Sequence, residues 1–193
     1  MKNNWSHGLS RQVSGVRLNA TDFYPTPLWC AENLDVDWSK FKSAHEPCRG
    51  DGRLYNWLKQ KNIPTTYTEI TEGLDFFEWS GNTDLVFTNP PFSLAQEFIT
   101  HSVKSANTVF MLLRLNYLAS IKRYDWWLKH PPVALYVLSK RPSFTGSGTD
   151  ATDYAWFVWD KTDRIPRGVH FVQPPTAEQT KRDNEACKAA LVK

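Results

Sequence analysis

Short apolar runs alternate with segments of helical periodicity along most of the chain. The runs predict strands at residues 43–46, 65–70, 85–88, 108–115, 133–138 and 154–159. Segments between several of them predict helices at residues 26–34, 54–61, 93–106 and 120–129. Residues 109–113 are continuously apolar, which is typical of a strand covered on both faces. This alternation of strands and helices predicts a parallel α/β sheet.

The two ends of the chain depart from this pattern. Residues 1–20 show no periodicity and predict a flexible N-terminal arm. Residues 161–193 are polar and predict a C-terminal extension with a short helix at residues 177–191. Thr26 followed by Pro27 predicts the start of the first helix, with Thr26 as its N-cap. The 193 residues therefore predict one folded domain, at residues 21–160, with a segment outside it at each end.

Cysteine content and hydropathy indicate the compartment in which the protein is expected to work. The three cysteines are odd in number and isolated, so neither a disulfide framework nor a zinc site is predicted. No apolar stretch is long enough to span a bilayer, and the first residues contain no apolar signal region. We therefore expect a soluble cytoplasmic protein without a metal site and without a membrane partner.

Charge is unevenly distributed along the chain. The net charge of +3 is too small to indicate a nucleic-acid-binding protein by itself. Residues 68–90 contain five acidic residues and no Lys or Arg, whereas residues 111–145 contain six basic residues and one acidic residue. The first region suits a cationic ligand and the second suits phosphate. Either run could instead be an ordinary solvated surface.

The sequence Asn89-Pro90-Pro91-Phe92 follows the apolar strand predicted at residues 85–88. Two successive prolines cannot donate ladder hydrogen bonds, so the strand must end there. The Asn89 side chain and the Pro90 carbonyl oxygen are then free to accept hydrogen bonds. Two neighbouring acceptors suit an exocyclic amine.

A second motif, Glu46-Pro47-Cys48-Arg49-Gly50-Asp51-Gly52, lies between a predicted strand and a predicted helix. Glycines at positions 50 and 52 allow a tight turn and a close approach of the backbone to a ligand. Glu69 follows about twenty residues later, at the end of the next strand, where an acid binds ribose hydroxyls in nucleotide-binding folds. There is no third glycine of a dinucleotide pattern, which disfavours a nicotinamide cofactor.

These two motifs and the N-terminal sequence Asp22-Phe23-Tyr24-Pro25-Thr26-Pro27 resemble those of S-adenosylmethionine-dependent amino-methyltransferases. The resemblance covers roughly residues 20–160 and is strongest to the small phage-type DNA N6-adenine methyltransferases. It implies a Rossmann-like class I methyltransferase fold, with a mostly parallel seven-stranded sheet, helices on both faces and a last strand that inserts antiparallel. It also implies that residues 21–160 are the catalytic domain of an enzyme from a bacterial or phage-infected cell.

The resemblance implies the cofactor site. Tyr24, Pro25 and Thr26 would close over S-adenosylmethionine, and Glu69 would hold its ribose. The full set of implied cofactor-binding residues is Tyr24, Pro25, Thr26, Glu46, Pro47, Gly50, Gly52, Glu69, Asp75 and Phe76. Phe76 could instead be an ordinary core residue, and Phe77 competes with it for contact with the adenine ring.

The resemblance also implies the chemistry. Asn89, Pro90, Pro91 and Phe92 would hold the target adenine, so that its amine attacks the sulfonium methyl directly and S-adenosylhomocysteine is the product. A base within a duplex must first be flipped out, and aromatic stacking can offset that cost. Phe92 and Phe144 are the candidates for stacking, although Phe144 could equally anchor a loop. The candidates for binding phosphate are Lys122, Arg123, Lys140 and Arg141.

DNA adenine is the leading substrate, and several alternatives remain open. Similar motifs occur in RNA adenine methyltransferases and in enzymes that methylate glutamine side chains of proteins. A non-catalytic nucleic-acid-binding module built on the same fold is the alternative outside enzymes. The chain leaves no room for a long target-recognition domain, so we expect short or relaxed sequence specificity, read mainly by a mobile loop at residues 139–152.

Overall fold

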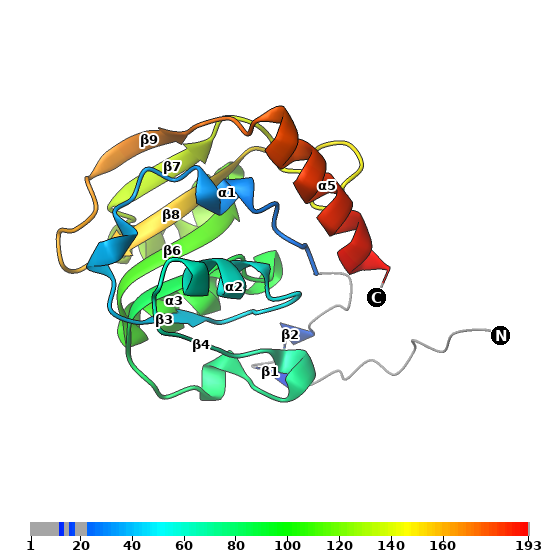
Figure 1. Ribbon diagram of the computed structural model, residues 1–193. Coiled ribbons are helices and arrows are strands. Elements are labelled where there is room, and N and C mark those ends of the chain that lie inside the picture. The colour runs from blue at the N-terminus through cyan, green and yellow to red at the C-terminus, as the bar shows by residue number, and fades with distance from the viewer. Residues whose placement is uncertain (1–11, 14–15, 18–22, 193) are drawn as a thin grey trace.

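One sheet of seven strands organises the molecule. The computed structural model describes residues 12–13, 16–17 and 23–192. The strand order is β4-β3-β5-β6-β8-β7-β9 (Figure 1). The strands are β3 (Ala44–Glu46), β4 (Thr65–Tyr67), β5 (Thr83–Thr88), β6 (Ala106–Arg114), β7 (Ala134–Leu138), β8 (Tyr154–Asp160) and β9 (Gly168–Val172). Only β8 runs antiparallel to its neighbours, β6 and β7, and the other pairs of adjacent strands are parallel. The predicted mostly parallel sheet with an inserted antiparallel strand is therefore confirmed.

Alternate residues of the central strands enter two separate cores. In β8, Tyr154, Trp156 and Val158 belong to one core, whereas Ala155 and Phe157 belong to the other. The helices α1 (Trp29–Glu32), α2 (Arg53–Gln60) and α5 (Ala177–Leu191) cover the first face, as Figure 1 shows. The helices α3 (Ala95–Ser105) and α4 (Tyr124–Lys129) cover the second. Helices thus lie on both faces, as predicted.

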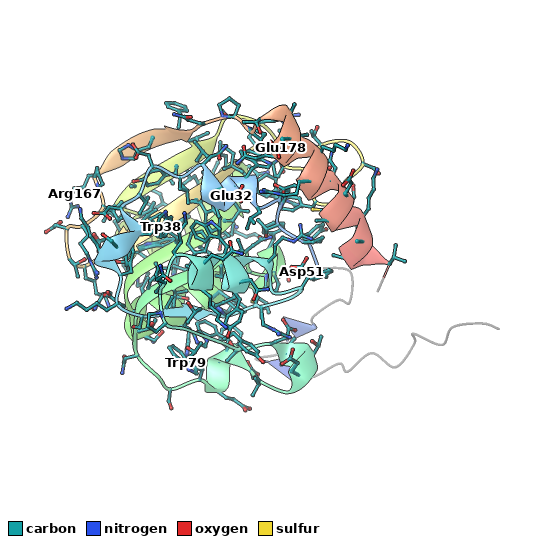
Figure 2. All side chains as sticks on the ribbon, viewed as in Figure 1. Glu32, Trp38, Asp51, Trp79, Arg167 and Glu178 are labelled. Carbon is teal, nitrogen blue, oxygen red and sulfur yellow. The ribbon has the colours of Figure 1, made fainter. Side chains whose placement is uncertain are left out.

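Short 3-10 helices connect many of these elements. They are η1 (Trp38–Lys40), η2 (Ile70–Glu72), η3 (Phe76–Glu78), η4 (Phe92–Leu94), η5 (Leu115–Leu118) and η6 (Ile121–Arg123). Trp38 of η1 fills the core under α2, with its ring centroid 4.8 Å from that of Trp57 and 5.5 Å from that of Phe87 (Figure 2). The predicted arm, residues 1–20, lies outside the described residues except for two short paired strands, β1 (Gln12–Val13) and β2 (Val16–Arg17).

The C-terminal segment is part of the packed fold, contrary to the predicted domain boundary near residue 160. Strand β9 pairs with β7 at the edge of the sheet, and α5 packs against α1. The buried Asp183 of α5 accepts a hydrogen bond from the Trp29 backbone N–H (2.9 Å). Strand β9 was not predicted, although Val169, Phe171 and Val172 are apolar; in the structure Val169 and Phe171 are 59% and 74% exposed, and Val172 is buried.

The first helix does not begin at Thr26. Helix α1 begins at Trp29 and is preceded by Leu28, which has no capping side chain. The Thr26 hydroxyl instead accepts a hydrogen bond from the Asn89 side chain (3.0 Å). Thr26 therefore binds Asn89, a residue distant in sequence, and does not cap a helix.

Candidate active site

The carboxyl ends of β3, β4, β5 and β6 meet at one edge of the sheet, beside the start of the antiparallel β8. Glu46 ends β3, Glu69 follows β4, and Asn89 follows β5. Arg114 ends β6, opposite Tyr154 at the start of β8. Ligands of open α/β sheets bind at this edge, so it is the candidate active site. The fold thus brings together the glycine loop and the Asn-Pro-Pro-Phe motif.

The Asn89 amide is held in one orientation. Its Nδ2 atom donates hydrogen bonds to the Tyr24 backbone oxygen (3.2 Å) and to Thr26 Oγ1 (3.0 Å). Its Oδ1 atom is buried and has no hydrogen-bond partner within the described residues. A buried acceptor without a partner is costly, so such an atom indicates that a ligand supplies the donor. The side chain therefore offers one fixed acceptor.

The backbone after Asn89 offers a second acceptor. The Pro91 carbonyl oxygen accepts from the Leu94 N–H (3.0 Å), which closes the turn of η4. No hydrogen bond to the Pro90 carbonyl oxygen is found within residues 23–192. The prolines end β5 as predicted, and they leave the Asn89 side chain and the Pro90 carbonyl as neighbouring acceptors.

Phe92 lies in an aromatic cluster next to these acceptors. Its ring stacks on Tyr24 (5.5 Å between centroids) and contacts Tyr154 (5.7 Å), and the Arg114 guanidinium lies 4.9 Å from its centroid. Phe144 packs against Tyr24 (5.7 Å) and Tyr154 (5.2 Å) and is only 3% exposed. Phe144 therefore has no free face for a base in this structure, and it occupies the position expected of a loop anchor.

Arg114 and Tyr154 were not among the predicted site residues. The Arg114 Nε atom donates to the Tyr154 hydroxyl (3.1 Å), and burial raises the pKa of Tyr154. Together they form the wall of the site beside Phe92. One sequence signal could have found Arg114, because it is the first charged residue after the long apolar run of β6 and so stands at the carboxyl end of that strand.

The glycine loop is covered by the N-terminal motif. Gly50 and Gly52 have φ angles of 53° and 83°, which favour glycine. The Gly50 N–H donates to Glu69 Oε2 (2.8 Å), so the loop is tied to the end of β4. A side chain at position 50 would place its Cβ 2.8 Å from the Phe23 ring, which lies directly over the loop. The N-terminal motif therefore contacts the glycine loop through Phe23, and Asp22 lies outside the described residues.

Two further contacts hold the N-terminal motif in place. Arg53 of α2 donates to the Thr26 carbonyl oxygen (3.2 Å), and the Cys187 thiol of α5 donates to the Pro25 carbonyl oxygen (3.3 Å). Pro47 lies in the glycine loop, where its carbonyl oxygen accepts from Thr68 Oγ1 (2.9 Å). The N-terminal motif is therefore held by contacts from α2 and α5, which are distant from it in sequence.

Glu46 is a fully buried carboxyl group at the base of the glycine loop. Its Oε1 atom accepts from the Cys48 N–H (3.3 Å). Its Oε2 atom and the neighbouring Thr88 Oγ1 are buried and have no hydrogen-bond partner of good geometry within the described chain. Burial raises the pKa of Glu46 to about 8. A cationic ligand beside it would favour the ionised form and supply the missing partner.

Glu69 and Asp75 shape the backbone that follows β4. Glu69 Oε1 accepts from the Thr71 N–H (3.1 Å) and hydroxyl (2.8 Å), and Asp75 Oδ1 accepts from the Phe77 N–H (2.9 Å). Phe76 is 3% exposed, which fits the alternative that it is a core residue. Phe77 is only partly buried, so it is the better placed of the two to contact a bound ring.

Most of the predicted phosphate-binding side chains already have partners. Arg123 donates to the Tyr117 carbonyl oxygen from Nε (3.1 Å) and Nη2 (2.9 Å). Arg141 pairs with Asp153 (2.7 Å), and Lys140 donates to Thr180 Oγ1 (3.4 Å). Lys122 is exposed on η6. These residues follow the carboxyl ends of β6 and β7, on the side of the sheet where Asn89 lies.

The site offers one buried acceptor that suits a cationic cofactor. In the part of the chain that the structure describes, no group of three or more His, Cys, Asp or Glu side chains could hold a metal ion. The buried Glu46 Oε2 atom fits the cationic methionine part of S-adenosylmethionine, because it is an acceptor without a hydrogen-bond partner within the described residues. None of the helices described is both long and apolar enough to cross a membrane.

Comparison with known proteins identifies the fold. No protein-family model and no curated protein matches the sequence. Similar solved structures include a protein provisionally described as an RNA methyltransferase from Pyrococcus horikoshii (14% identity, TM-score 0.52, covering 70% of this chain and 81% of that one). Another is the methyltransferase subunit of a type I restriction-modification system from Streptococcus thermophilus (14% identity, TM-score 0.54, covering 87% of this chain and 53% of that one).

The description of a third similar structure names its cofactor. It is a protein provisionally described as a class I S-adenosylmethionine-dependent methyltransferase from Listeria monocytogenes (10% identity, TM-score 0.51, covering 85% of this chain and 68% of that one). The chain spans about half the length of the restriction-modification subunits that it matches. At these identities the likeness concerns the fold, and the chain has the Rossmann-like class I methyltransferase fold.

Proposed function

We propose that this protein transfers a methyl group from S-adenosylmethionine to the exocyclic N6 of adenine in DNA. The observation that carries the proposal is the buried Asn89 Oδ1 atom, which has a fixed orientation and no partner within the described residues. The neighbouring Pro90 carbonyl would be the second acceptor for the two hydrogens of the amine. Similar folds in methyltransferases support methyl transfer in general.

Positioning is the main catalytic device in this proposal. When bound, S-adenosylmethionine supplies an electrophilic methyl group, which moves to the amine by in-line displacement as the sulfur keeps the bonding electrons and an amine proton leaves to water. Asn89 and Pro90 draw the amine nitrogen toward tetrahedral geometry, because both of its hydrogens are held. The lone pair is then directed at the methyl group. Neither residue changes its protonation state.

The remaining residues would bind the cofactor and the flipped nucleotide. Tyr24, Pro25 and Thr26 would close over S-adenosylmethionine, while Glu46 would face its methionine end and Glu69 its ribose. Phe92 would contact the target base after Tyr24 or Arg114 moves from its ring. This stacking would offset part of the few kcal/mol that base flipping costs.

RNA is the second candidate substrate. The similar Pyrococcus protein is described as an RNA methyltransferase, and this chain covers most of its length. The Asn89 site would hold the same adenine amine in either nucleic acid. We favour DNA because the Asn-Pro-Pro-Phe motif resembles that of the phage-type DNA enzymes, and we expect short specificity read by residues 139–152.

Isotope transfer tests this proposal. The protein is incubated with methyl-labelled S-adenosylmethionine and, separately, with unmethylated DNA, RNA and protein extract, and the digested products are identified by mass spectrometry. We expect N6-methyladenine from DNA and a loss of about 100-fold or more in Asn89→Ala, because one preorganised acceptor is removed. Gln60→Ala, which removes an exposed amide from α2, is the matched control. A labelled methyl group in RNA or in glutamine would reassign the substrate. If none of the three substrates becomes labelled, the proposed activity is overturned.

A further inference from the structure

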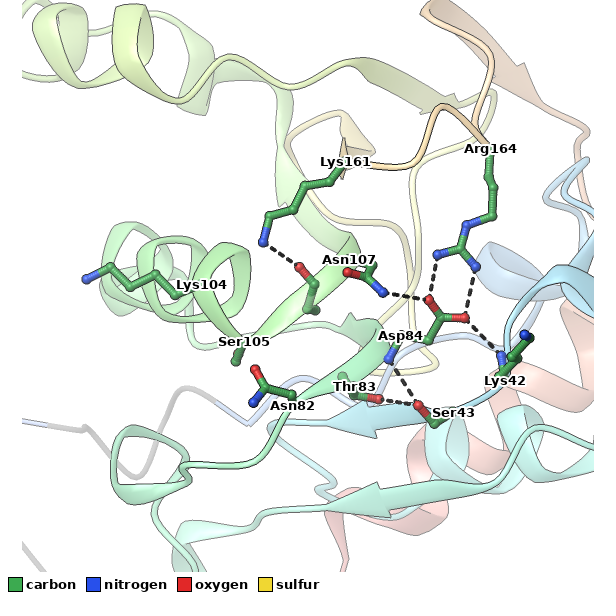
Figure 3. Close-up of a pocket in the computed structure, with 11 residues that line it drawn as sticks. Lys42, Ser43, Asn82, Thr83, Asp84, Lys104, Ser105, Asn107, Lys161 and Arg164 are labelled. Atoms are coloured by element: carbon green, nitrogen blue, oxygen red, sulfur yellow. Dashed lines mark hydrogen bonds and ion pairs between the residues drawn. The ribbon is translucent and has the colours of Figure 1, made fainter.

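A cavity of about 690 Å³ opens at the amino edge of the sheet, opposite the candidate active site (Figure 3). Its lining comes from the starts of β3, β5 and β6, the end of α3 and the turn after β8. Asn89 lies beyond the other end of β5, a strand of six residues. At about 3.3 Å per residue, the two sites are roughly 20 Å apart.

Among the residues that line this cavity, Asp84 supplies the carboxylate, and hydrogen bonds already occupy both of its oxygen atoms. Asp84 accepts two hydrogen bonds from Arg164 (2.5 and 2.8 Å), and it also accepts from the Lys42 N–H (3.0 Å) and from Asn107 Nδ2 (3.1 Å). The bidentate Arg164 pair holds the pKa of Asp84 well below its usual range. The carboxylate therefore has little capacity left to neutralise the other cations.

Three lysines line the cavity together with this pair. In Figure 3, Lys104 and Lys161 lie on one side of Asp84 and Lys42 lies on the other. The Lys161 ammonium donates to the Ala106 carbonyl oxygen (2.9 Å) and keeps two further hydrogens. Across residues 23–192, no hydrogen bond or ion pair is found for the ammonium groups of Lys42 and Lys104. The cavity is consequently a site of unneutralised positive charge.

We propose that this cavity binds the phosphate backbone of nucleic acid, at a site separate from Asn89. The proposal rests on the nucleic-acid substrate proposed above. No aromatic side chain lines the cavity, so it offers nothing on which a base could stack. Lysine, asparagine and serine side chains are donors suited to phosphate oxygens. The lining thus favours a backbone over a nucleotide recognised by its base.

This second site would lengthen the footprint on the nucleic acid without reading its sequence. Roughly 20 Å corresponds to about six base steps at 3.4 Å each. Contacts to phosphates position a protein and carry no base information. The amino-edge contacts would therefore raise affinity for long substrates equally for all sequences.

The salt dependence of binding tests the proposal. Binding to a duplex of about 30 base pairs is measured by fluorescence anisotropy over a range of salt, using Asn89→Ala protein without S-adenosylmethionine so that no methylation occurs. Adding Lys42→Gln and Lys104→Gln should reduce the slope of log K against log salt by about 1.8, and should weaken binding at 0.1 M salt by roughly tenfold or more. The matched control carries Lys59→Gln and Lys181→Gln, which neutralise two exposed lysines on α2 and α5.

The outcomes separate this proposal from the proposed activity. An unchanged slope in the cavity variant, or an equal loss in the control, overturns the amino-edge site even if DNA is methylated. A reduced slope confined to the cavity variant supports the site even if no methyl transfer to DNA occurs. Melting temperature and S-adenosylmethionine affinity, measured on every variant, show that the fold is intact.

Discussion

Two acceptors from the N-terminal motif decide which atom of the Asn89 amide faces the open edge. The Tyr24 carbonyl can only accept, so it requires the Nδ2 atom, and the Thr26 hydroxyl accepts the second hydrogen of that atom, so Oδ1 points the other way. The Tyr24 bond is to backbone and cannot be removed by a side-chain substitution. Thr26 is therefore the residue through which this orientation can be tested.

Thr26→Ala should slow methyl transfer while leaving substrate binding largely intact. Removing one hydrogen bond of about 1 kcal/mol lets the amide sample other orientations, so kcat should fall about fivefold. KM for the nucleic acid should change by less than about twofold, because Thr26 does not itself touch the base. Steady-state kinetics with a labelled methyl donor measures both quantities.

Thr26→Ser is the control for this prediction. Serine keeps the hydroxyl that accepts from Asn89, so activity should return close to that of the wild type. Thr26→Val has a similar shape and lacks the hydroxyl, so it should behave as Thr26→Ala does. A Thr26→Val variant with normal kcat would show that the hydroxyl does not position the amide.

Glu46 should give the folded protein a distinctive pH dependence. Burial raises the pKa of Glu46 from 4.5 to about 8. Between these values the folded state binds a proton that the unfolded state lacks, so this group's contribution to stability is present below about pH 4.5 and is lost as pH rises toward 8. Glu46→Gln removes that loss, because an amide does not ionise.

Urea unfolding of wild type and Glu46→Gln at several pH values measures this effect. The two proteins should have similar free energies of unfolding near pH 4. The variant should become more stable by a few kcal/mol at pH 9, since each unit of pKa shift corresponds to about 1.4 kcal/mol. A difference between the proteins that does not vary with pH would show that Glu46 ionises normally in the folded state.

At the scale of elements, the loop between β7 and β8 is docked on α5. A Cβ atom at Gly146 would overlap the Asn184 backbone oxygen of α5, and the φ angle of Gly146 is +71°. Phe144 anchors the same loop from the core side. The loop predicted to read the target sequence is thus fastened at two points. Its expected mobility would have to lie in the exposed residues 147–149.

Gly146→Ala should separate this loop from α5. Either the loop or the helix must move, so we expect destabilisation by several kcal/mol. Gly148 is a matched control, because its φ angle is +72° and no atom lies within 4 Å of the position of an added Cβ. Gly148→Ala should cost only about 1 kcal/mol of backbone strain, and lower Tm by about 2–4 °C. Equal Tm losses in the two variants would contradict the packing of Gly146 on α5.

At the scale of the whole molecule, the sequence predicted the central strands well and the edge poorly. Strands β5, β6 and β8 were found because each is buried on both faces and reads as a continuous apolar run. Strand β9 was missed because it lies at an edge and exposes most of its residues. Its five residues lie within an otherwise polar segment, so its short apolar stretch did not stand out in the sequence.

The site shows the same division between local and long-range information. The glycine loop and the prolines after Asn89 could be predicted, because backbone conformation there depends on the residue types themselves. The burial of Phe144 and the pairing of Thr26 with Asn89 depend on segments more than sixty positions apart, so no local pattern contains them. Arg114 and Tyr154 meet across two strands whose pairing the sequence did not specify.

The C-terminal segment supplies the last test of how the molecule is assembled. Removing residues 161–193 would expose the edge of β7 and leave the Trp29 N–H and the Pro25 carbonyl without their partners in α5. We expect this truncated chain to lose cooperative unfolding and the near-ultraviolet circular dichroism of its packed tryptophans. Removing only Val192 and Lys193 should preserve both, because Val192 is 87% exposed. A chain ending at residue 160 that still unfolds cooperatively would restore the interpretation of this segment as an appendage, since the sheet and its site would then be complete without it.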